Sequence, residues 1–161
     1  MGSILTTLQQ PEYLHVLINH LPVVGLLIGL LSLLAALVFN KPAAIFIGLA
    51  LVALCALSIW PVSYYGEAGY DRVYSLADRV GDAYLKQHRD LAEDWSWLFY
   101  ATGLIALAAI AVGYKKPTQM RFLAGLVVIL AIASLLAGSL IAESGGRIRH
   151  EEFRRGIPPI E

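Results

Sequence analysis

Residues 13–29 read YLHVLINHLPVVGLLIG and begin an apolar stretch that carries no Lys, Arg, Asp or Glu before Lys41. About 20 such residues are enough to cross the hydrocarbon core of a bilayer as a helix. The stretch therefore predicts a first membrane span over about residues 13–40. Two histidines, His15 and His20, stand at its start, and ionisable residues at a membrane span usually mark a ligand, a proton path or a buried partner.

The whole chain has the composition of a membrane protein, because 58% of its 161 residues are hydrophobic and only 15% are charged. Four charge-free stretches predict four spans, at about residues 13–40, 43–66, 95–114 and 122–142. Tight turns join the first span to the second and the third to the fourth. We therefore expect a single all-α domain over residues 1–161, built as a four-helix transmembrane bundle with both termini on one side.

The long connection at residues 67–94 has a helical pattern. Its apolar residues recur every three or four positions: Val73, Leu76, Val80, Tyr84, Leu91 and Trp95. This period is typical of an amphipathic helix, so we expect a surface helix between the second and third spans. His88 belongs to the same apolar stripe. After the paired glycines Gly145 and Gly146, which are expected to end the fourth helix, residues 145–161 are predicted to be an extended tail.

The charges predict the orientation of the bundle. Four basic residues and no acidic residue lie in or beside the two short turns: Lys41, Lys115, Lys116 and Arg121. By the positive-inside rule these turns are cytoplasmic, which predicts a multi-pass protein of the bacterial inner membrane with both termini in the periplasm. The other eight Lys and Arg residues favour the opposite orientation by raw count, but they are mixed with all twelve acidic residues in the long connection and the two terminal segments. No basic cluster is interleaved with aromatic residues, so nothing indicates nucleic-acid binding.

All four histidines fall on the outer side of this layout, and they are the candidate metal ligands: His15, His20, His88 and His150. Imidazole ligates haem iron, copper and zinc. Structural zinc sites usually use cysteine, and the single cysteine, Cys55, lies within a span. Copper often adds methionine, but Met1 and Met120 are badly placed for these histidines. The pattern favours haem b, with a haem-free copper or zinc site as the alternative.

A haem also needs a slot between helices and cations for its propionates. Gly25 and Gly29 form a stripe of small residues on the first span that could admit the macrocycle. Arg72, Arg147 and Arg149 lie near the outer ends of spans and could bind propionates. The alternative for the glycines is that they allow close helix packing, and we favour this alternative. The alternative for the arginines is that they are solvated residues at the rim of the bundle.

His15 and His20 cannot easily bind one metal from a regular helix. Five residues at about 100° each separate their directions by about 140°, so they would serve different partners and either one or two haems could bind. Pro22 removes a backbone donor and is expected to bend the helix near His20. His20 has the strongest claim to be a ligand and His150, in the tail, the weakest. For each histidine the alternative is a hydrogen-bonded residue at the membrane interface.

At these residues the chain resembles an uncharacterised family of small four-span bacterial membrane domains, which occur alone or fused to Rieske iron–sulfur or cytochrome c domains. The family opens with H-P-x-x-V-H-F-P, and residues 15–22, HVLINHLP, have the same histidine spacing and closing proline. His88 matches a histidine before the third span, and Gly145, Gly146 and His150 loosely match a terminal G-G-x-L-V-Y-x-H-G. Val16 replaces the usual first proline, and His150 stands two positions early. The fusions imply membrane redox chemistry.

We therefore expect a haem-binding electron-transfer subunit with histidine ligands near the outer face. Its expected partners are other redox subunits or a periplasmic electron carrier, with quinol as a further candidate. The second hypothesis is a haem-free metal site, and the third is a structural subunit of a larger membrane complex. No grouping of nucleophile, histidine and carboxylate indicates an independent enzyme. Glu143 and Ser144, at the end of the fourth span, could hold a ligating imidazole in place.

Overall fold

The computed structural model describes residues 2–154, with side chains from Ile4 onward. Every regular element in this part of the chain is a helix, which confirms the all-α prediction. In chain order the elements are α1 (Gly2–Thr7), α2 (Pro11–Ile18), the π-helix η1 (Leu21–Gly25), α3 (Leu26–Val38), α4 (Pro42–Leu57), α5 (Ile59–Leu76), α6 (Arg79–Gly113), α7 (Pro117–Arg149) and the short 3₁₀ helix η2 (Glu151–Phe153).

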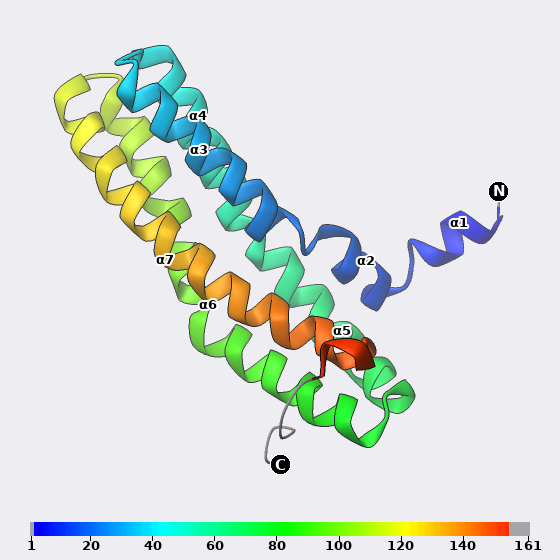
Figure 1. The fold of residues 1–161 in the computed structure, drawn as a ribbon. Helices are drawn as coiled ribbons and strands as arrows, with labels where there is room; N and C mark the ends of the chain where they lie inside the picture. The colour runs from blue at the N-terminus through cyan, green and yellow to red at the C-terminus, as the bar shows by residue number, and fades with distance from the viewer. Residues whose placement is uncertain (1, 155–161) are drawn as a thin grey trace.

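These elements form four helical stretches that are long and apolar enough to cross a membrane, within the part of the chain that is described. The stretches are Pro11–Val38, Pro42–Leu76, Arg79–Gly113 and Pro117–Arg149. The turns between α3 and α4 and between α6 and α7 lie at one end of the bundle, and α1 and the end of α7 lie toward the other (Figure 1). The predicted four-helix membrane bundle is thus confirmed.

The first turn depends on Asn40, whose φ of 52° lies in the left-handed region. Asn tolerates this conformation better than most residues, so the chain can reverse here and begin α4 at Pro42. The second turn is followed in the same way by a proline, Pro117, in the first turn of α7.

α6 and α7 run antiparallel, side by side, over most of their length (Figure 1). Their contacts include small residues, since a Cβ added at Gly138 would lie 3.0 Å from the ring of Phe99. Midway along, the hydroxyl groups of Thr102 and Ser134 are 2.9 Å apart, and both residues are fully buried. Hydroxyl pairs of this kind join helices within membranes. The Thr102–Ser134 pair also fixes the register of α6 against α7.

The connection between the second and third spans differs in detail from the expected surface helix. α5 continues the second span to Leu76, and α6 begins at Arg79, so the amphipathic sequence forms the adjoining ends of these two spans. The chain reverses at Ala77 and Asp78, which are both extended. Asp78 caps α6 by accepting a hydrogen bond of 2.6 Å from the backbone N–H of Gly81.

The fourth span also extends further than expected, because α7 continues through Gly145 and Gly146 to Arg149. Both glycines have α-helical neighbours and face other side chains: Gly145 lies against His88, and Gly146 against Phe153. At Gly145 the lack of a side chain makes room for the His88 ring, whereas a Cβ at Gly146 would make only an ordinary contact, 3.6 Å from Phe153. Neither glycine ends the helix, so the prediction of an extended tail from residue 145 is wrong as far as Arg149. Residues 155–161 of that predicted tail lie outside the described residues.

The first span is interrupted where Pro22 was expected to bend it. α2 ends at Ile18, and the chain resumes as a π-helix from Leu21 before α3 begins. Pro22 cannot donate a backbone hydrogen bond, which interrupts the regular α-helical pattern. Within the π-helix the backbone N–H groups of Val24 and Gly25 both donate to the carbonyl of His20. As a result α2 leaves the axis of α3 at an angle (Figure 1).

Candidate functional site: two facing imidazoles

Two of the four histidines come together toward the end of the bundle opposite its two short turns. The ring centroids of His15 on α2 and His88 on α6 are 6.1 Å apart, and the ring planes are nearly perpendicular, at 89°. The two residues are far apart in the sequence and belong to different spans. Each ring also lies against a further helix, His15 against α5 and His88 against α7.

His88 is held against α7. Its Nδ1 lies 2.8 Å from the carbonyl oxygen of Ile141 and 3.3 Å from the hydroxyl of Ser144. The Ser144 hydroxyl itself donates to the Ile141 carbonyl, at 2.8 Å. Room for the ring comes from Gly145, because a Cβ there would lie 3.0 Å from two ring atoms of His88.

His15 is held against α5 in a similar way. Its Nδ1 lies 2.8 Å from the carbonyl oxygen of Val62. A Cβ at Gly66 would lie 2.8 Å from that same nitrogen, so the imidazole occupies the space that a side chain at position 66 would fill.

The two histidines therefore share one local arrangement: each ring lies on a helical glycine and bonds to the carbonyl four residues before that glycine. A carbonyl can only accept, so Nδ1 of each ring carries the proton and donates. In a neutral imidazole this leaves the lone pair on Nε2. Among the described residues, Nε2 of neither ring has a recorded hydrogen-bond partner. Histidines that ligate metals usually have this form, with one nitrogen free and the other donating to a carbonyl or carboxylate.

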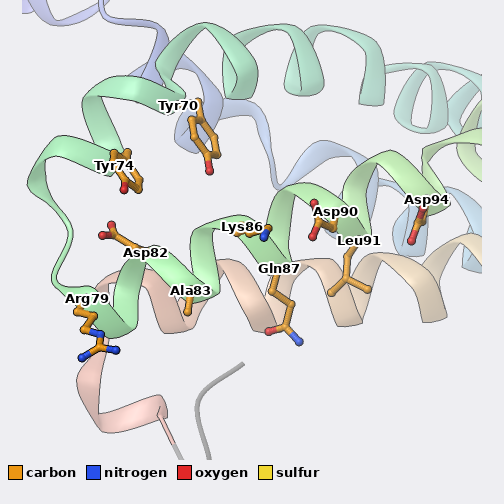
Figure 2. A pocket seen from close by; sticks show the side chains of 10 residues that line it. All are labelled: Tyr70, Tyr74, Arg79, Asp82, Ala83, Lys86, Gln87, Asp90, Leu91 and Asp94. Carbon is orange, nitrogen blue, oxygen red and sulfur yellow. The ribbon is translucent and has the colours of Figure 1, made fainter. Parts of the chain in front are cut away.

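A cleft of about 630 Å³ opens between α5 and α6 (Figure 2). Tyr70 and Tyr74 of α5 project into it, and its α6 wall includes Gln87 and Leu91, which flank His88 in the sequence. Its lining also contains the only buried side-chain oxygen in the described chain without a hydrogen-bond partner, Oδ1 of Asp82. The cleft thus lies between two of the helices that form the histidine site, although neither imidazole lines it.

The other two histidines are not part of the ring pair. His20 lies at the break in the first span, with an exposed side chain. His150 follows α7, where its Nδ1 lies 3.0 Å from a carboxylate oxygen of Glu152 and its ring contacts Phe153, with centroids 4.9 Å apart. Both partners of that ion pair are more than half exposed.

Gly25 and Gly29 pack the first span against α4. A Cβ at Gly25 would lie 2.8 Å from the sulfur of Cys55, and one at Gly29 would lie 3.1 Å from the backbone nitrogen of Val52. This agrees with the close-packing alternative for these two glycines.

Each of the three arginines expected near propionates has a partner within the chain. Arg72 pairs with Glu12 at 2.6 Å, and Arg147 pairs with Glu143 at 2.6 Å. Arg149 donates to the carbonyl of Leu76 at 3.0 Å. The structure does not place these guanidinium groups in contact with the imidazole pair.

Most of the groups that hold the imidazoles could not be identified from sequence. The two acceptors are backbone carbonyls, which every residue has, and Gly66 and Gly145 resemble ordinary turn or helix-ending glycines. Ser144 is the exception, because it was expected to support an imidazole and it contacts His88. The signal that could have found the glycines is their position on the outer halves of spans, level with the histidines.

No known protein family model matches this chain, and no curated protein or solved structure matches it either. Within the described residues, no group of three or more His, Cys, Asp and Glu side chains is arranged to hold a metal ion. The site must therefore be interpreted from the geometry of the two imidazoles.

Proposed function

We propose that this chain is an integral membrane electron-transfer subunit that binds haem b between His15 and His88. The observation that carries the proposal is the pairing of the two rings. In each ring Nδ1 donates a hydrogen bond to a backbone carbonyl, which leaves Nε2 free to bind a metal. Two imidazoles from different helices are the protein ligands that a bis-histidine haem uses.

The separation of the two rings suits this group. Imidazole nitrogens ligate metals at about 2.0 Å, as in zinc sites, so two opposed rings sharing one metal would have centroids about 6 Å apart. The observed separation is 6.1 Å. The cleft between α5 and α6 is not lined by either imidazole, so the fit rests on the ring pair alone.

The chain's own contribution would be to hold and orient the ligands. The carbonyls of Val62 and Ile141 fix the tautomer of each ring and increase the basicity of its Nε2. Gly66 and Gly145 let the rings lie against α5 and α7. The bound haem would supply a one-electron iron couple, whose potential depends on its axial ligands and their surroundings.

We further propose that the site faces the periplasm at the bacterial inner membrane. This rests on the positive charge of the two turns at the opposite end of the bundle. From there the site would exchange electrons with other redox subunits or a periplasmic carrier, with quinol as a candidate donor.

The test is to purify the full chain in detergent after haem-replete expression. We expect a Soret band, a low-spin six-coordinate spectrum and one haem per chain by the pyridine haemochrome assay. His15→Ala and His88→Ala should both change the spectrum, whereas His150→Ala, which replaces an exposed histidine, should not. His20→Ala tests whether a second haem binds, as the sequence allows. Loss of half the haem in that variant would show that His20 ligates a second haem.

A haem-free copper site is the second candidate, because a ring separation of 6.1 Å would equally suit a single ion bound by both Nε2 atoms. Elemental analysis separates the candidates: iron with a Soret band supports haem, and copper without one supports the bare ion. A colourless protein without metal whose histidine variants still associate with partner subunits would instead support a structural role.

A further inference from the structure

We propose that Gly69 is a positioning residue for His15. Because Gly69 has no side chain, the backbone of α2 can contact α5, and this contact sets where the His15 imidazole lies relative to His88. The link to metal ligation rests on the proposed function, but the effect on the position of His15 does not.

The position of α2 is not set by continuation of the first span. α2 ends at Ile18 and is separated from α3 by the π-helix that contains Pro22. No residue of α2 is buried, so apolar burial contributes little to holding it. Its position must therefore depend on its packing against α5.

The backbone of α2 meets α5 at Gly69, which is itself buried. A Cβ added there would lie 2.8 Å from the backbone nitrogen of Glu12 and 2.9 Å from its Cα. These are backbone atoms of a helix and cannot rotate away as the end of a flexible side chain could. A methyl group at position 69 would force α2 to move as a whole.

Such a movement would reach His15 directly. His15 lies three residues after Glu12, or about 4.5 Å along the helix, and Gly66, beneath its ring, lies three residues before Gly69 on the same face of α5. The hydrogen bonds that hold His88 are to α7, whereas the ion pair of Glu12 is to Arg72 of α5. The effect should therefore be selective for His15.

The ion pair between Arg72 and Glu12 acts on the same turn of α2, with the nitrogen and oxygen 2.6 Å apart. The Arg72 side chain is 62% exposed, and exposed ion pairs contribute weakly to stability. Loss of this pair should shift α2 in the same sense as a methyl group at Gly69, but by less.

The experiment compares Gly69→Ala with Gly125→Ala, a matched change in α7 where an added Cβ has nothing within 4 Å. In the haem-loaded full chain, Gly69→Ala should convert at least half of the low-spin six-coordinate signal to a five-coordinate one while haem content stays near that of the parent. In the haem-free protein, modification by diethyl pyrocarbonate, located by mass spectrometry, should rise several-fold at His15 and stay unchanged at His88. Gly125→Ala should resemble the parent in both assays.

A Gly69→Ala protein whose spectrum and His15 reactivity equal those of Gly125→Ala would overturn the proposal. If the parent binds no haem, the proposed function fails, but the histidine modification still tests the role of Gly69. If Gly69→Ala does not fold, Arg72→Ala replaces it, with an expected rise of about twofold in His15 reactivity; no rise would count against the proposal.

Discussion

The two halves of the histidine site use the same local contacts on very different supports. His88 projects from the 35-residue α6, which packs along the 33-residue α7. His15 projects from the eight-residue α2, which contains no buried residue and is joined to its span through a π-helix. One imidazole is therefore part of the bundle, and the other belongs to a short helix docked onto it.

This difference indicates that the two rings will respond differently to mutation. Segments with few buried contacts open more easily than the core of a protein. The free energy needed to displace His15 should be smaller than that needed to displace His88, although their hydrogen bonds to carbonyls have the same length, 2.8 Å.

The largest expected difference is between the two alanine variants. If haem binds as proposed, His88→Ala should reduce haem content to less than about a tenth, because the ligand on the rigid side would be lost and the docked helix would not hold the group alone. His15→Ala should keep a larger share of the haem as a five-coordinate species. Haem content and spin state, measured at equal protein concentration, test the difference, and equal losses in the two variants would contradict it.

A smaller effect is expected from the two glycines beneath the rings. Gly66→Ala and Gly145→Ala would place a Cβ at 2.8 Å and 3.0 Å from ring atoms of His15 and His88, respectively. Each ring must shift by a few tenths of an ångström, so each variant should reproduce part of the effect of the corresponding histidine change. Reduced-state spectra and thermal release of haem would measure this, with Gly125→Ala as the control that meets no neighbour. Swapped phenotypes would show that the assignment of ring to glycine is incorrect.

Ser144→Ala should have a weaker effect still. The serine hydroxyl is a second and longer contact of His88 Nδ1, at 3.3 Å, while the Ile141 carbonyl remains at 2.8 Å. A hydrogen bond of this kind contributes about 1 kcal/mol, so haem affinity should fall by less than about tenfold. Haem titration of the purified variant would measure the change, and complete loss of haem would mean that Ser144 does more than support the ring.

The smallest effect on the site is expected at the outer tip of α6. The side-chain hydrogen bond from Arg154, and then the backbone N–H of Gly81, lower the pKa of the Asp78 carboxyl below its ordinary value. A lowered pKa in the folded state means that the contribution of Asp78 to stability is present above the unfolded-state pKa and is lost as the pH falls through the folded-state value. Asp78→Asn should therefore lower the unfolding temperature slightly at pH 7 and by progressively less as the pH falls below the unfolded-state pKa, with haem content at pH 7 unchanged.

Much of the fold could be predicted from sequence, because a charge-free stretch of sufficient length has few alternatives in a membrane. The connection at residues 67–94 was less predictable. An amphipathic pattern is the same whether a helix lies on a surface or forms the end of a longer span, and the turn at Ala77 and Asp78 occupies only two residues. The end of α7 was missed because Gly145 was interpreted from its usual role in ending helices and not from what lies against it.

The candidate site was only partly predictable for a different reason. Histidines are rare enough in this chain to be identified as candidates, but their pairing depends on where α2 docks. That position is set by a backbone contact between Gly69 and Glu12, and backbone contacts leave little trace in sequence. The same holds for the carbonyls of Val62 and Ile141. His20, which has the strongest claim from its position beside Pro22, lies exposed at the break that this proline produces.

The buried hydroxyl pair of Thr102 and Ser134 limits which sequence changes α7 can accept during evolution. The exposed residues Leu136 and Leu140 between Ser134 and Ile141 could be replaced by other apolar residues with little penalty. Inserting a residue there would turn the rest of α7 by about 100° and advance it by about 1.5 Å. The Ile141 carbonyl would then swing away from His88. The segment of α7 between Ser134 and Ile141 should therefore tolerate substitutions at its exposed positions but not insertions or deletions.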